Sequence, residues 1–519
     1  MARPIGELSP DGRWRWDGER WVGVRTAAAD TWVERLATTL GDLRIARPAG
    51  WPVIALMVVV GVLTDLALRS SRVGLAATLL LGSICAGLVL SRRVVNPHGV
   101  VALGLAVLLA AGLSLRRSSW LLLPDLAVAA GLVLTACGLA AEGSLLDLTV
   151  ARAQAHAARV LVHLFVGAAF AAAPLRAAIA RLRVERRAHA AAVLRGLLLA
   201  IPVVLLLGWL LGQADAVFAS FFKVRTDPLD WTGHVLLFAL GALLAAGLVR
   251  AASAEPMAAL PQIGWRLGGI ETLIVLAALD LVFATFTAAQ VVAATGAGAG
   301  AIRAQGLTYA EYARSGFFQI LWVAGITLVL LLVLRTFVDR DSPIGRRALL
   351  VAAEMAILFT LLIVVVAFQR LSLYVSVYGL SMLRLYCLVF AGWIAVVYAA
   401  LGVSLIRLDK QRQWFPAVMV LSGIAGLLAL NVVNPEALVA RYNLTATQQT
   451  QRFDPDYLVT LSADAMPALA EALPEMDASA RKTVRERLCG GPSFTAADWT
   501  GLNWSDVAAD TARARACTG

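Results

Sequence analysis

The chain has 519 residues and a formal net charge of +11, but only 15% of its residues are charged and 60% are hydrophobic. A soluble protein has about 45–50% apolar and about 25% charged residues, so this composition, with a mean hydropathy of +0.76, excludes an ordinary soluble domain. The positive charge lies in short arginine-rich loops such as 181–187 and 339–347, with no separate domain around them. We therefore expect the lipid bilayer as a partner, and no nucleic acid.

The first segment, residues 1–28, is rich in tryptophan. Its stretch SPDGRWRWDGERW alternates tryptophans with two Asp-Gly dipeptides, which are typical of turns. Trp14, Trp16 and Trp21 would give a very small hairpin one apolar face. The segment is either an accessory structural element or a docking site for an envelope protein partner.

Residues 29–50 predict an amphipathic helix lying along the membrane before the first span. Its apolar residues recur at helical spacing, namely Trp32, Val33, Leu36, Leu40 and Leu43. Because a long polar segment precedes the first apolar run, we expect no signal peptide.

Apolar runs of roughly 18–25 residues, the length needed to cross about 30 Å of hydrocarbon, follow one another along the chain. They lie at 51–68, 73–90, 99–115, 121–141, 194–212, 232–250, 269–294, 317–336, 349–369, 383–405 and 415–432. A further run at 158–174 carries Arg159 and His163, and predicts either a span or a helix at the interface. The predicted fold class is all-α: a polytopic transmembrane helix bundle of about 11–13 spans in residues 51–432.

The arginine distribution predicts the topology, because loops rich in Lys and Arg stay on the cytoplasmic side. The arginine-rich loops are 175–193, 337–348 and 406–414. The loops that alternate with them, expected outside, are 213–230, 295–316 and 370–382. This pattern places the N-terminus in the cytoplasm and the C-terminus outside it.

The outside loop before 317–336 contains the stretch LTYAEYARSGFFQ (307–319). Thr308 and Glu311 have the spacing of a capping box, which satisfies the first amides of a helix. Tyr309 and Tyr312 lie on one face with Gly316, and Arg314 can pair with Glu311 across one turn. The stretch is either a well-capped helix start in the aromatic belt or the lining of an outer vestibule.

A second tyrosine-rich stretch, residues 369–386, follows the run at 349–369. Tyr374 and Tyr378 are one helical turn apart, and Arg384 follows them. We expect a short interfacial helix there, leading into the next span. Tyr and Arg together bind carboxylates, phosphates and sugars, but they also serve as membrane-belt residues.

The run at 269–294 contains the candidate polar site of the membrane region. Asp280 lies near its middle, where an aspartate costs about 2.5–3.5 kcal/mol on insertion scales, so it is expected to face the bundle interior. Glu271 lies near the cytoplasmic end and Gln290 near the other end. At 100° per residue Glu271 and Asp280 point to opposite sides. Asp280 is either a helix–helix tether or part of a proton or ion relay.

Signatures of catalysis are absent from the sequence, including a phosphate-binding loop, H-E-x-x-H and G-x-S-x-G. The five histidines are scattered without the spacing of metal ligands. We therefore expect no metal site, no cofactor and no catalytic residues.

The tail, residues 433–519, changes composition to eleven acids against eight bases, and predicts a small helical domain on the extracytoplasmic face. Pro467 and Pro474 divide it into pieces. Cys489 and Cys517 are the cysteines with access to an oxidising compartment. We predict a disulfide between them, with two free thiols as the alternative. The main apolar residues between the two cysteines are Trp499, Leu502, Trp504 and Val507.

Five ordered motifs carry a resemblance to a known family. They are ETLIVLAALDLVFATFTAAQ, GLTYAEYARSGFF, YVSVYGLSMLRLY, NPEALVARYNL and DPDYLVTLSADAMPAL, within roughly residues 50–470. Together they resemble a bacterial multi-span family, the domain of unknown function DUF4173, with DUF4153 as its relative. The N-terminal tryptophan stretch is similar to a motif of actinobacterial membrane proteins. The resemblance implies the fold class and the bacterial plasma membrane, but no activity.

Three classes of function remain open. The first is transport or an envelope-associated role, with Asp280 and the outer aromatic stretches forming a path. The second is a membrane scaffold or signalling protein whose tail or tryptophan hairpin recruits partners. The third, an enzyme, is less favoured: a membrane-embedded transferase for lipid-linked substrates would need external acids, and those available are Asp215, Asp227 and Asp230. An inverted repeat would favour transport, and none is evident.

Overall fold

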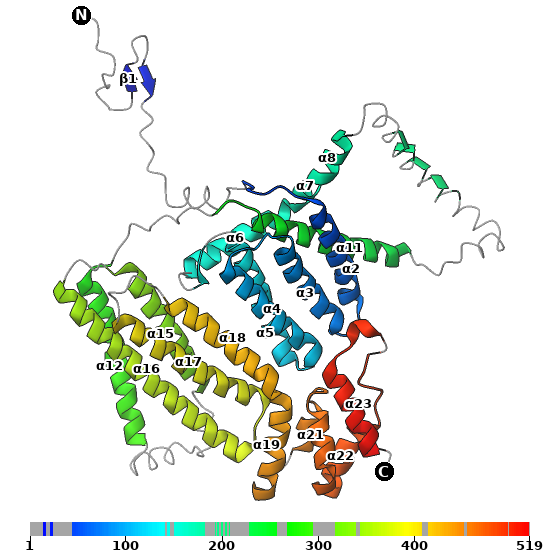
Figure 1. Cartoon of the computed structure of the whole chain (residues 1–519). Helices are drawn as coiled ribbons and strands as arrows, with labels where there is room; N and C mark the ends of the chain where they lie inside the picture. Colours follow the sequence, from blue (N-terminus) through cyan, green and yellow to red (C-terminus); the bar gives the residue numbers. More distant parts are fainter. Residues whose placement is uncertain are drawn as a thin grey trace, which may run out of the picture.

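A computed structural model gives the three-dimensional structure of the chain (Figure 1). The structure describes residues 14–16, 21–23, 44–140, 143–145, 150–181, parts of 192–207, 228–256, 267–293, 317–338, 343–406, 414–450, 454–496 and 498–517. Among the predicted elements, most of the amphipathic helix at 29–50 and most of the run at 194–212 lie outside the described residues.

The tryptophan-rich segment forms two short strands, β1 (Trp14–Trp16) and β2 (Trp21–Gly23). They pair antiparallel, with Trp16 opposite Trp21 and Trp14 opposite Gly23. The small hairpin expected from the alternating tryptophans and Asp-Gly dipeptides is therefore present.

The first group of helices packs around one apolar core, to which Leu88, Leu103 and Leu109 contribute fully buried side chains. Its helices are α2 (Trp51–Arg69), α3 (Leu75–Leu90), α4 (Pro97–Leu115), α5 (Ser119–Gly138), α6 (Val150–Phe165), α7 (Gly167–Ala171), α8 (Ala173–Arg181) and α11 (Pro228–Ala252). α4 begins where a helix is expected to begin, because Asn96 accepts a hydrogen bond from the His98 amide and Pro97 occupies the first turn.

The second group of helices has its own core, centred on Tyr398, Leu401 and Ala356. Its helices are α12 (Gly269–Ala293), α15 (Phe317–Phe337), α16 (Pro343–Tyr378), α17 (Met382–Ile406) and α18 (Phe415–Val433). Figure 1 shows this group beside α2–α5, with α18 next to them. α18 joins the two groups, since Ile424 and Leu427 belong to the first core.

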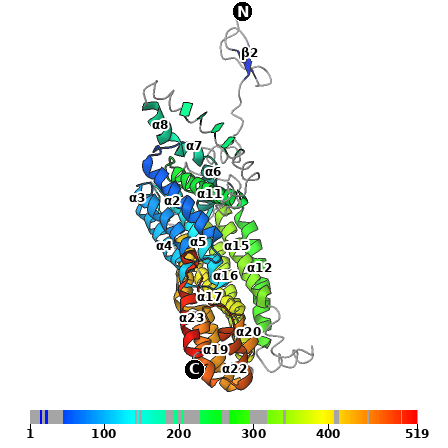
Figure 2. The same cartoon turned by 90° about the vertical axis from the view of Figure 1, so that its right-hand side faces the viewer.

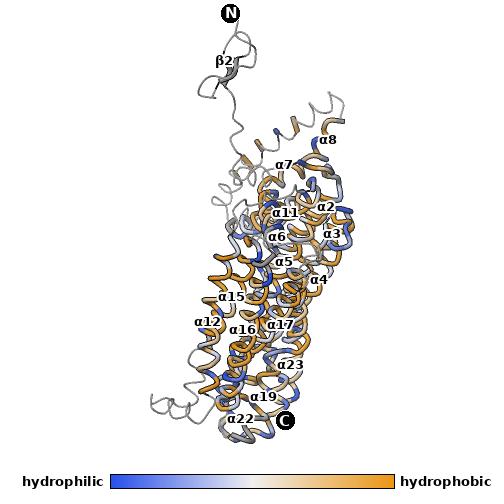
Figure 3. The backbone as a smooth tube through the Cα atoms, turned by 90° about the vertical axis from the view of Figure 1, so that its left-hand side faces the viewer, coloured by the Kyte–Doolittle hydropathy of each residue, from blue (hydrophilic) through white to orange (hydrophobic). Residues whose placement is uncertain are grey.

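Nine helices of the described residues are long and apolar enough to cross a membrane, so the chain is a multi-pass membrane protein. α3, with 16 residues, is slightly shorter than these. The ambiguous run at 158–174 falls in a broken helix, because Gln154–Phe165 and Gly167–Ala180 are bent by 64°. Figure 3 shows mostly hydrophobic helices through the middle of the molecule and more hydrophilic residues at the end that carries α19 and α22.

The expected separate interfacial helix at 369–386 is wrong. α16 continues without a break for 36 residues to Tyr378, so the two tyrosines lie in its last turns. The helix ends there because Gly379 has φ +75°, a left-handed conformation that favours glycine, and α17 starts three residues later. The apolar run and the tyrosine-rich turns that follow it therefore belong to one helix.

The tail folds as a helical domain, which we call the tail domain. Its elements are α19 (Pro435–Thr450), α20 (Pro455–Val459), α21 (Met466–Ala472), η2 (Leu473–Glu475), α22 (Ala478–Cys489), η3 (Trp499–Gly501) and α23 (Trp504–Cys517). Asp454, Asp477 and Asp498 each accept a backbone amide hydrogen bond at the start of a helix. Figure 2 shows this domain at one end of the bundle.

The core of the tail domain is shared with the bundle. Leu458, Met466, Leu469 and Leu488 are almost fully buried in it, together with residues from the end of α16 and the start of α17, namely Val375, Leu380, Met382 and Leu385. The domain is therefore packed onto the membrane region by its own core.

Candidate functional site

The tail domain meets the membrane bundle at a cluster of buried charged and polar groups. We call the contact formed by Arg117, Ser118, Asp464, Ser505 and Asp506 the junction. Arg117 and Ser118 lie in the short turn between α4 and α5, whereas Asp464 precedes α21 and the other two begin α23. Segments about 350–390 positions apart in sequence therefore meet at one place.

Arg117 and Asp506 form the ion pair of the junction. Two guanidinium nitrogens of Arg117 contact the two carboxylate oxygens of Asp506, with Nε donating over 3.1 Å. Asp506 is 1% exposed. The same guanidinium donates to the carbonyl of Val73 at 2.7 Å, so one side chain joins the α4–α5 turn, the α2–α3 turn and the tail domain. Bidentate geometry of this kind makes strong and directional pairs.

Asp464 is the second buried acid of the junction, and its oxygens are satisfied by short hydrogen bonds. One oxygen accepts the backbone amides of Arg117 at 2.8 Å and Ser118 at 2.7 Å. The other accepts the hydroxyl of Ser505. Asp464 thus fixes the α4–α5 turn from the tail domain, because its carboxylate binds two backbone amides directly before α5.

Contacts to the backbone complete the junction. The side-chain amide of Asn503 donates to the carbonyls of Leu113 and Arg116 at 3.1 and 2.9 Å, which satisfies the free C-terminal end of α4. The α2–α3 turn lies so close to η3 that a Cβ on Gly74 would stand 2.5 Å from the carbonyl carbon of Gly501. Glycine is required at residue 74 by this approach.

A further acid, Glu436, lies beside the junction in the first turn of α19. It is 4% exposed and accepts hydrogen bonds from the amide and hydroxyl of Ser462, both at 2.6 Å. Burial raises the pKa of the Glu436 carboxyl above its usual range, although the Ser462 bonds act against it. Deeper in the membrane region, Asp125 of α5 is 1% exposed and accepts both hydrogen bonds from the amide of Asn431, each at 3.0 Å.

The predicted membrane site at Asp280 has different surroundings. Asp280 lies on the face of α12 that carries the buried residues Leu276 and Phe283, so the face turned to the bundle includes it. Its Oδ1 atom is buried and has no hydrogen-bond partner within the described residues.

The other two residues predicted for α12 are separate from Asp280. Gln290 accepts a hydrogen bond from Arg370 of α16 at 2.6 Å. Glu271 is exposed and accepts the amide of Gly268 at 3.0 Å, as an acid does in the first turn of a helix. The three residues of α12 therefore have separate roles and form no common site.

Of the two stretches predicted to line the outer vestibule, the structure describes the residues of the second. Tyr309, Glu311, Tyr312 and Arg314 lie outside the described residues. Tyr374, Tyr378 and Arg384 come together: the two rings are 4.8 Å apart, and the guanidinium carbon lies 4.4 Å from the Tyr374 ring centre. Arg384 also donates to the carbonyls of Tyr378 and Gly379. These bonds hold the end of α16, so the cluster has a structural role whether or not it also binds a ligand.

Cys489 and Cys517 are joined by a disulfide, with Cα atoms 5.9 Å apart. The bond ties the end of α22 to the end of α23. The apolar residues between the cysteines are not the core of the domain, since Trp499 and Trp504 are 52% and 69% exposed. Each tryptophan is next in sequence to a residue that contacts the ends of α2–α4, namely Thr500 and Asn503. This position is suited to the aromatic belt of a membrane interface.

Sequence reasoning missed most of the residues that meet at the tail-side end of the bundle. Besides the junction, His234 of α11 contacts Asp65 of α2 at 2.7 Å, and Asp230 pairs with Arg69. One signal was available: the turns carrying Arg69, Arg116 and Arg117 fall on the side expected to be poor in cations. An arginine in a turn that is expected to be poor in cations indicates that its side chain pairs with another part of the fold.

Within the part of the chain that the structure describes, no three His, Cys, Asp or Glu side chains come together as a metal site. A comparison with protein families matches residues 103–472 to the family described as Domain of unknown function (DUF4153). This match covers more than half of the chain, which therefore belongs to that family. Comparisons with curated proteins and with solved structures found no match.

Proposed function

We propose that this member of the DUF4153 family is an envelope-associated protein of the bacterial plasma membrane, which holds its tail domain at the extracytoplasmic surface as a binding platform. The observation that carries this proposal is the junction. A tail tethered only by chain continuity would need no contact with the α4–α5 turn, yet Asp464 and Asp506 are buried against it. Burying two acids is costly unless they are paired, so the geometry specifies one fixed position.

The orientation is supported by the arginines and the cysteines together. The turns on the tail side contain arginines that are paired, such as Arg69 with Asp230 and Arg117 with Asp506. A disulfide between Cys489 and Cys517 suits an oxidising compartment. A cytoplasmic N-terminus and an extracytoplasmic C-terminus follow from this proposal. Kinship to DUF4173 and an actinobacterial type of tryptophan hairpin are proposals that rest on the motifs alone.

Transport is the second candidate function, and Asp280 favours it. A carboxylate on the inner face of a span, with a buried oxygen that has no partner in the described residues, is a suitable element of a proton or ion path. A scaffold that recruits proteins and a transferase for lipid-linked substrates are further alternatives, with fewer observations behind them.

A complementation experiment in a deletion strain separates the first two functions. Arg117→Leu breaks the junction and leaves Asp280 in place, whereas Asp280→Asn changes the membrane site and leaves the junction intact. If presentation of the tail domain is the function, Arg117→Leu fails to restore growth under envelope stress and Asp280→Asn restores it. The reverse pattern, at equal protein levels, supports transport and contradicts the proposal.

Sidedness is tested separately in intact cells. A membrane-impermeant thiol reagent should label Cys489 and Cys517 after mild reduction, and should not label a cysteine introduced at Arg347. Labelling of position 347 alone would overturn the orientation.

A further inference from the structure

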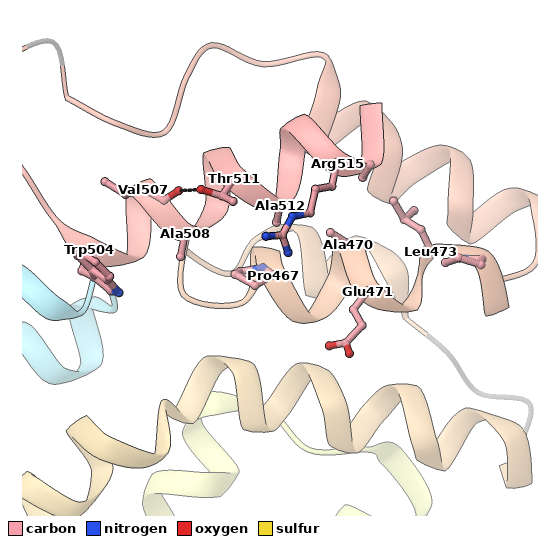
Figure 4. Close-up of a pocket in the computed structure, with 12 residues that line it drawn as sticks. Pro467, Ala470, Glu471, Leu473, Trp504, Val507, Ala508, Thr511, Ala512 and Arg515 are labelled. Atoms are coloured by element: carbon pink, nitrogen blue, oxygen red, sulfur yellow. Dashed lines mark hydrogen bonds between the residues drawn. The ribbon is translucent and has the colours of Figure 1, made fainter. Parts of the chain in front are cut away.

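The tail domain contains a groove of about 930 Å³ between α21 and α23 (Figure 4). This volume is within the range of about 300–1,000 Å³ found for small-molecule sites. Small apolar residues line both walls, including Pro467 and Ala470 on α21 and Ala508 and Ala512 on α23. A slender apolar ligand can approach such walls closely.

One end of the groove lies at the level where the membrane helices end. Trp504 lines that end and is 69% exposed. Its neighbours bind the end of span α4: Asn503 donates to the carbonyl of Leu113, and Ser505 donates to that of Leu115 at 2.9 Å. Trp504 therefore stands at the boundary between hydrocarbon and headgroups, where tryptophan is enriched.

The other end of the groove carries the two charged side chains of its lining, Arg515 and Glu471. Arg515 lines it, and Figure 4 shows this side chain reaching from α23 across the groove, while Glu471 leaves α21 in another direction. Arg515 is exposed, and among the residues that the structure describes it forms no salt bridge. A free guanidinium at the end of an apolar groove is suited to a phosphate or carboxylate.

The length of the groove fits one lipid chain. Trp504 and Arg515 are eleven residues apart on α23, which corresponds to about 16 Å along the helix axis. A lipid chain spans half of the roughly 30 Å hydrocarbon layer, or about 15 Å. A lipid with its headgroup at Arg515 would reach the membrane boundary at Trp504 with the end of its chain.

We propose that the groove binds an anionic phospholipid drawn from the adjoining leaflet, with the phosphate at Arg515 and one acyl chain along Ala512 and Ala508 to Trp504. The two ends of the groove match the two ends of such a lipid. The charged end lies far from the membrane, and the apolar walls lie beside the membrane. The inference deepens the proposed function, because it names the ligand class of the binding platform, and it rests on that function for the position of the tail domain.

Photo-crosslinking in lipid nanodiscs tests the proposal. The full chain carrying p-benzoylphenylalanine in place of Ala512 is placed in nanodiscs of phosphatidylcholine containing one fifth phosphatidylglycerol, and the tail peptides are analysed by mass spectrometry after irradiation. The same substitution at Lys482, an exposed residue of α22, is the matched position control. Arg515→Gln and Lys482→Gln are the matched charge variants.

We expect phosphatidylglycerol adducts at position 512 and none above background at position 482. Relative to its share of the lipid, phosphatidylglycerol should be favoured about five-fold, as one basic residue near anionic lipid predicts. Arg515→Gln should remove this preference and Lys482→Gln should keep it. Equal adducts at both positions, or a preference that survives Arg515→Gln, would overturn the proposal, as would a protein adduct at position 512 in cell membranes.

Both faces of a nanodisc are accessible, so this result does not depend on the orientation of the protein in cells. Failure of the lipid adduct therefore contradicts the ligand, whereas failure of the thiol labelling contradicts the proposed function.

Discussion

Asp464 in the tail domain and Asp280 in α12 are acids placed in the interior of the same protein, and their surroundings are opposite. Asp464 is 2% exposed and accepts hydrogen bonds from two amides and a hydroxyl. Asp280 has a buried oxygen with no partner within the described residues. A satisfied buried acid holds segments of the chain together. An unsatisfied one costs free energy and persists for another reason. Asp464 therefore has a structural role, whereas Asp280 is the candidate for a chemical role in the membrane region.

The largest effect is expected from breaking the ion pair of the junction. Arg117→Leu leaves the carboxylate of Asp506 buried without its main partner, which typically costs about 3–5 kcal/mol. We expect the contact of α21 and α23 with the α4–α5 turn to open while the bundle stays folded. Hydrogen exchange measured by mass spectrometry should show lost protection in α21 and α23 and unchanged protection in α12 and α15.

The double variant Arg117→Leu/Asp506→Leu supplies the control for this prediction. Removing both charges leaves no unpaired acid, so most of the lost protection should return. If the single and double variants lose protection equally, the pair contributes through packing alone and the comparison with Asp280 fails.

The disulfide should have the next largest effect. Cys489→Ser/Cys517→Ser opens a loop with a sequence separation of 28, which the chain-entropy model values at about 3 kcal/mol. We expect a lower unfolding temperature for the tail domain in detergent, and faster proteolysis between α22 and α23. The matched control is Cys85→Ser in the buried core of the first group, which should change the bundle and leave the tail unaffected. An unchanged tail in the double serine variant would contradict the prediction.

These two regions also differ in how well the sequence predicted them. The apolar runs gave the spans because hydrocarbon requires long apolar helices, and α2, α4 and α18 begin and end close to the predicted limits. The position of Asp280 on a packed face followed from the cost of a charge in the membrane. The junction was not predicted, because Arg117 and Asp506 are 389 positions apart. No local sequence pattern predicts a contact between residues so far apart in the chain.

The tail domain shows the same difference between local features, which the sequence predicts, and long-range contacts, which it does not. Its helix starts could be expected from Asp454 and Asp477, since capping is a local interaction. The core could not, because part of it comes from Val375, Leu380 and Leu385 in the membrane region.

The third prediction concerns Asp280. Replacing it by leucine removes a buried oxygen without a partner, and we expect the bundle to gain about 1–3 kcal/mol. Thermal unfolding of the purified protein in detergent measures this change, and Asp125→Leu is the control. Asp125 accepts hydrogen bonds from Asn431, so its replacement should destabilise the bundle. Destabilisation by Asp280→Leu would show that Asp280 is a tether and would end the contrast with Asp464.

The smallest effect is expected from the pH dependence of Glu436. Because burial raises the pKa of its carboxyl in the folded protein, its contribution to stability is fully present below the ordinary value of 4.5 and is lost as pH rises through the raised pKa. Glu436→Gln removes this titration while keeping the size and an acceptor for the Ser462 hydrogen bonds.

At neutral pH we expect Glu436→Gln to change the free energy of unfolding by no more than about 1 kcal/mol, as for a substitution that removes no packing. The groups facing Glu436, namely Asp464, Tyr386 and Tyr457, stay in place in both proteins. Unfolding temperatures measured from pH 4.5 upward should therefore fall more steeply for the wild type than for Glu436→Gln. Parallel curves would mean that Glu436 does not titrate in this range, and would contradict the raised pKa of its carboxyl.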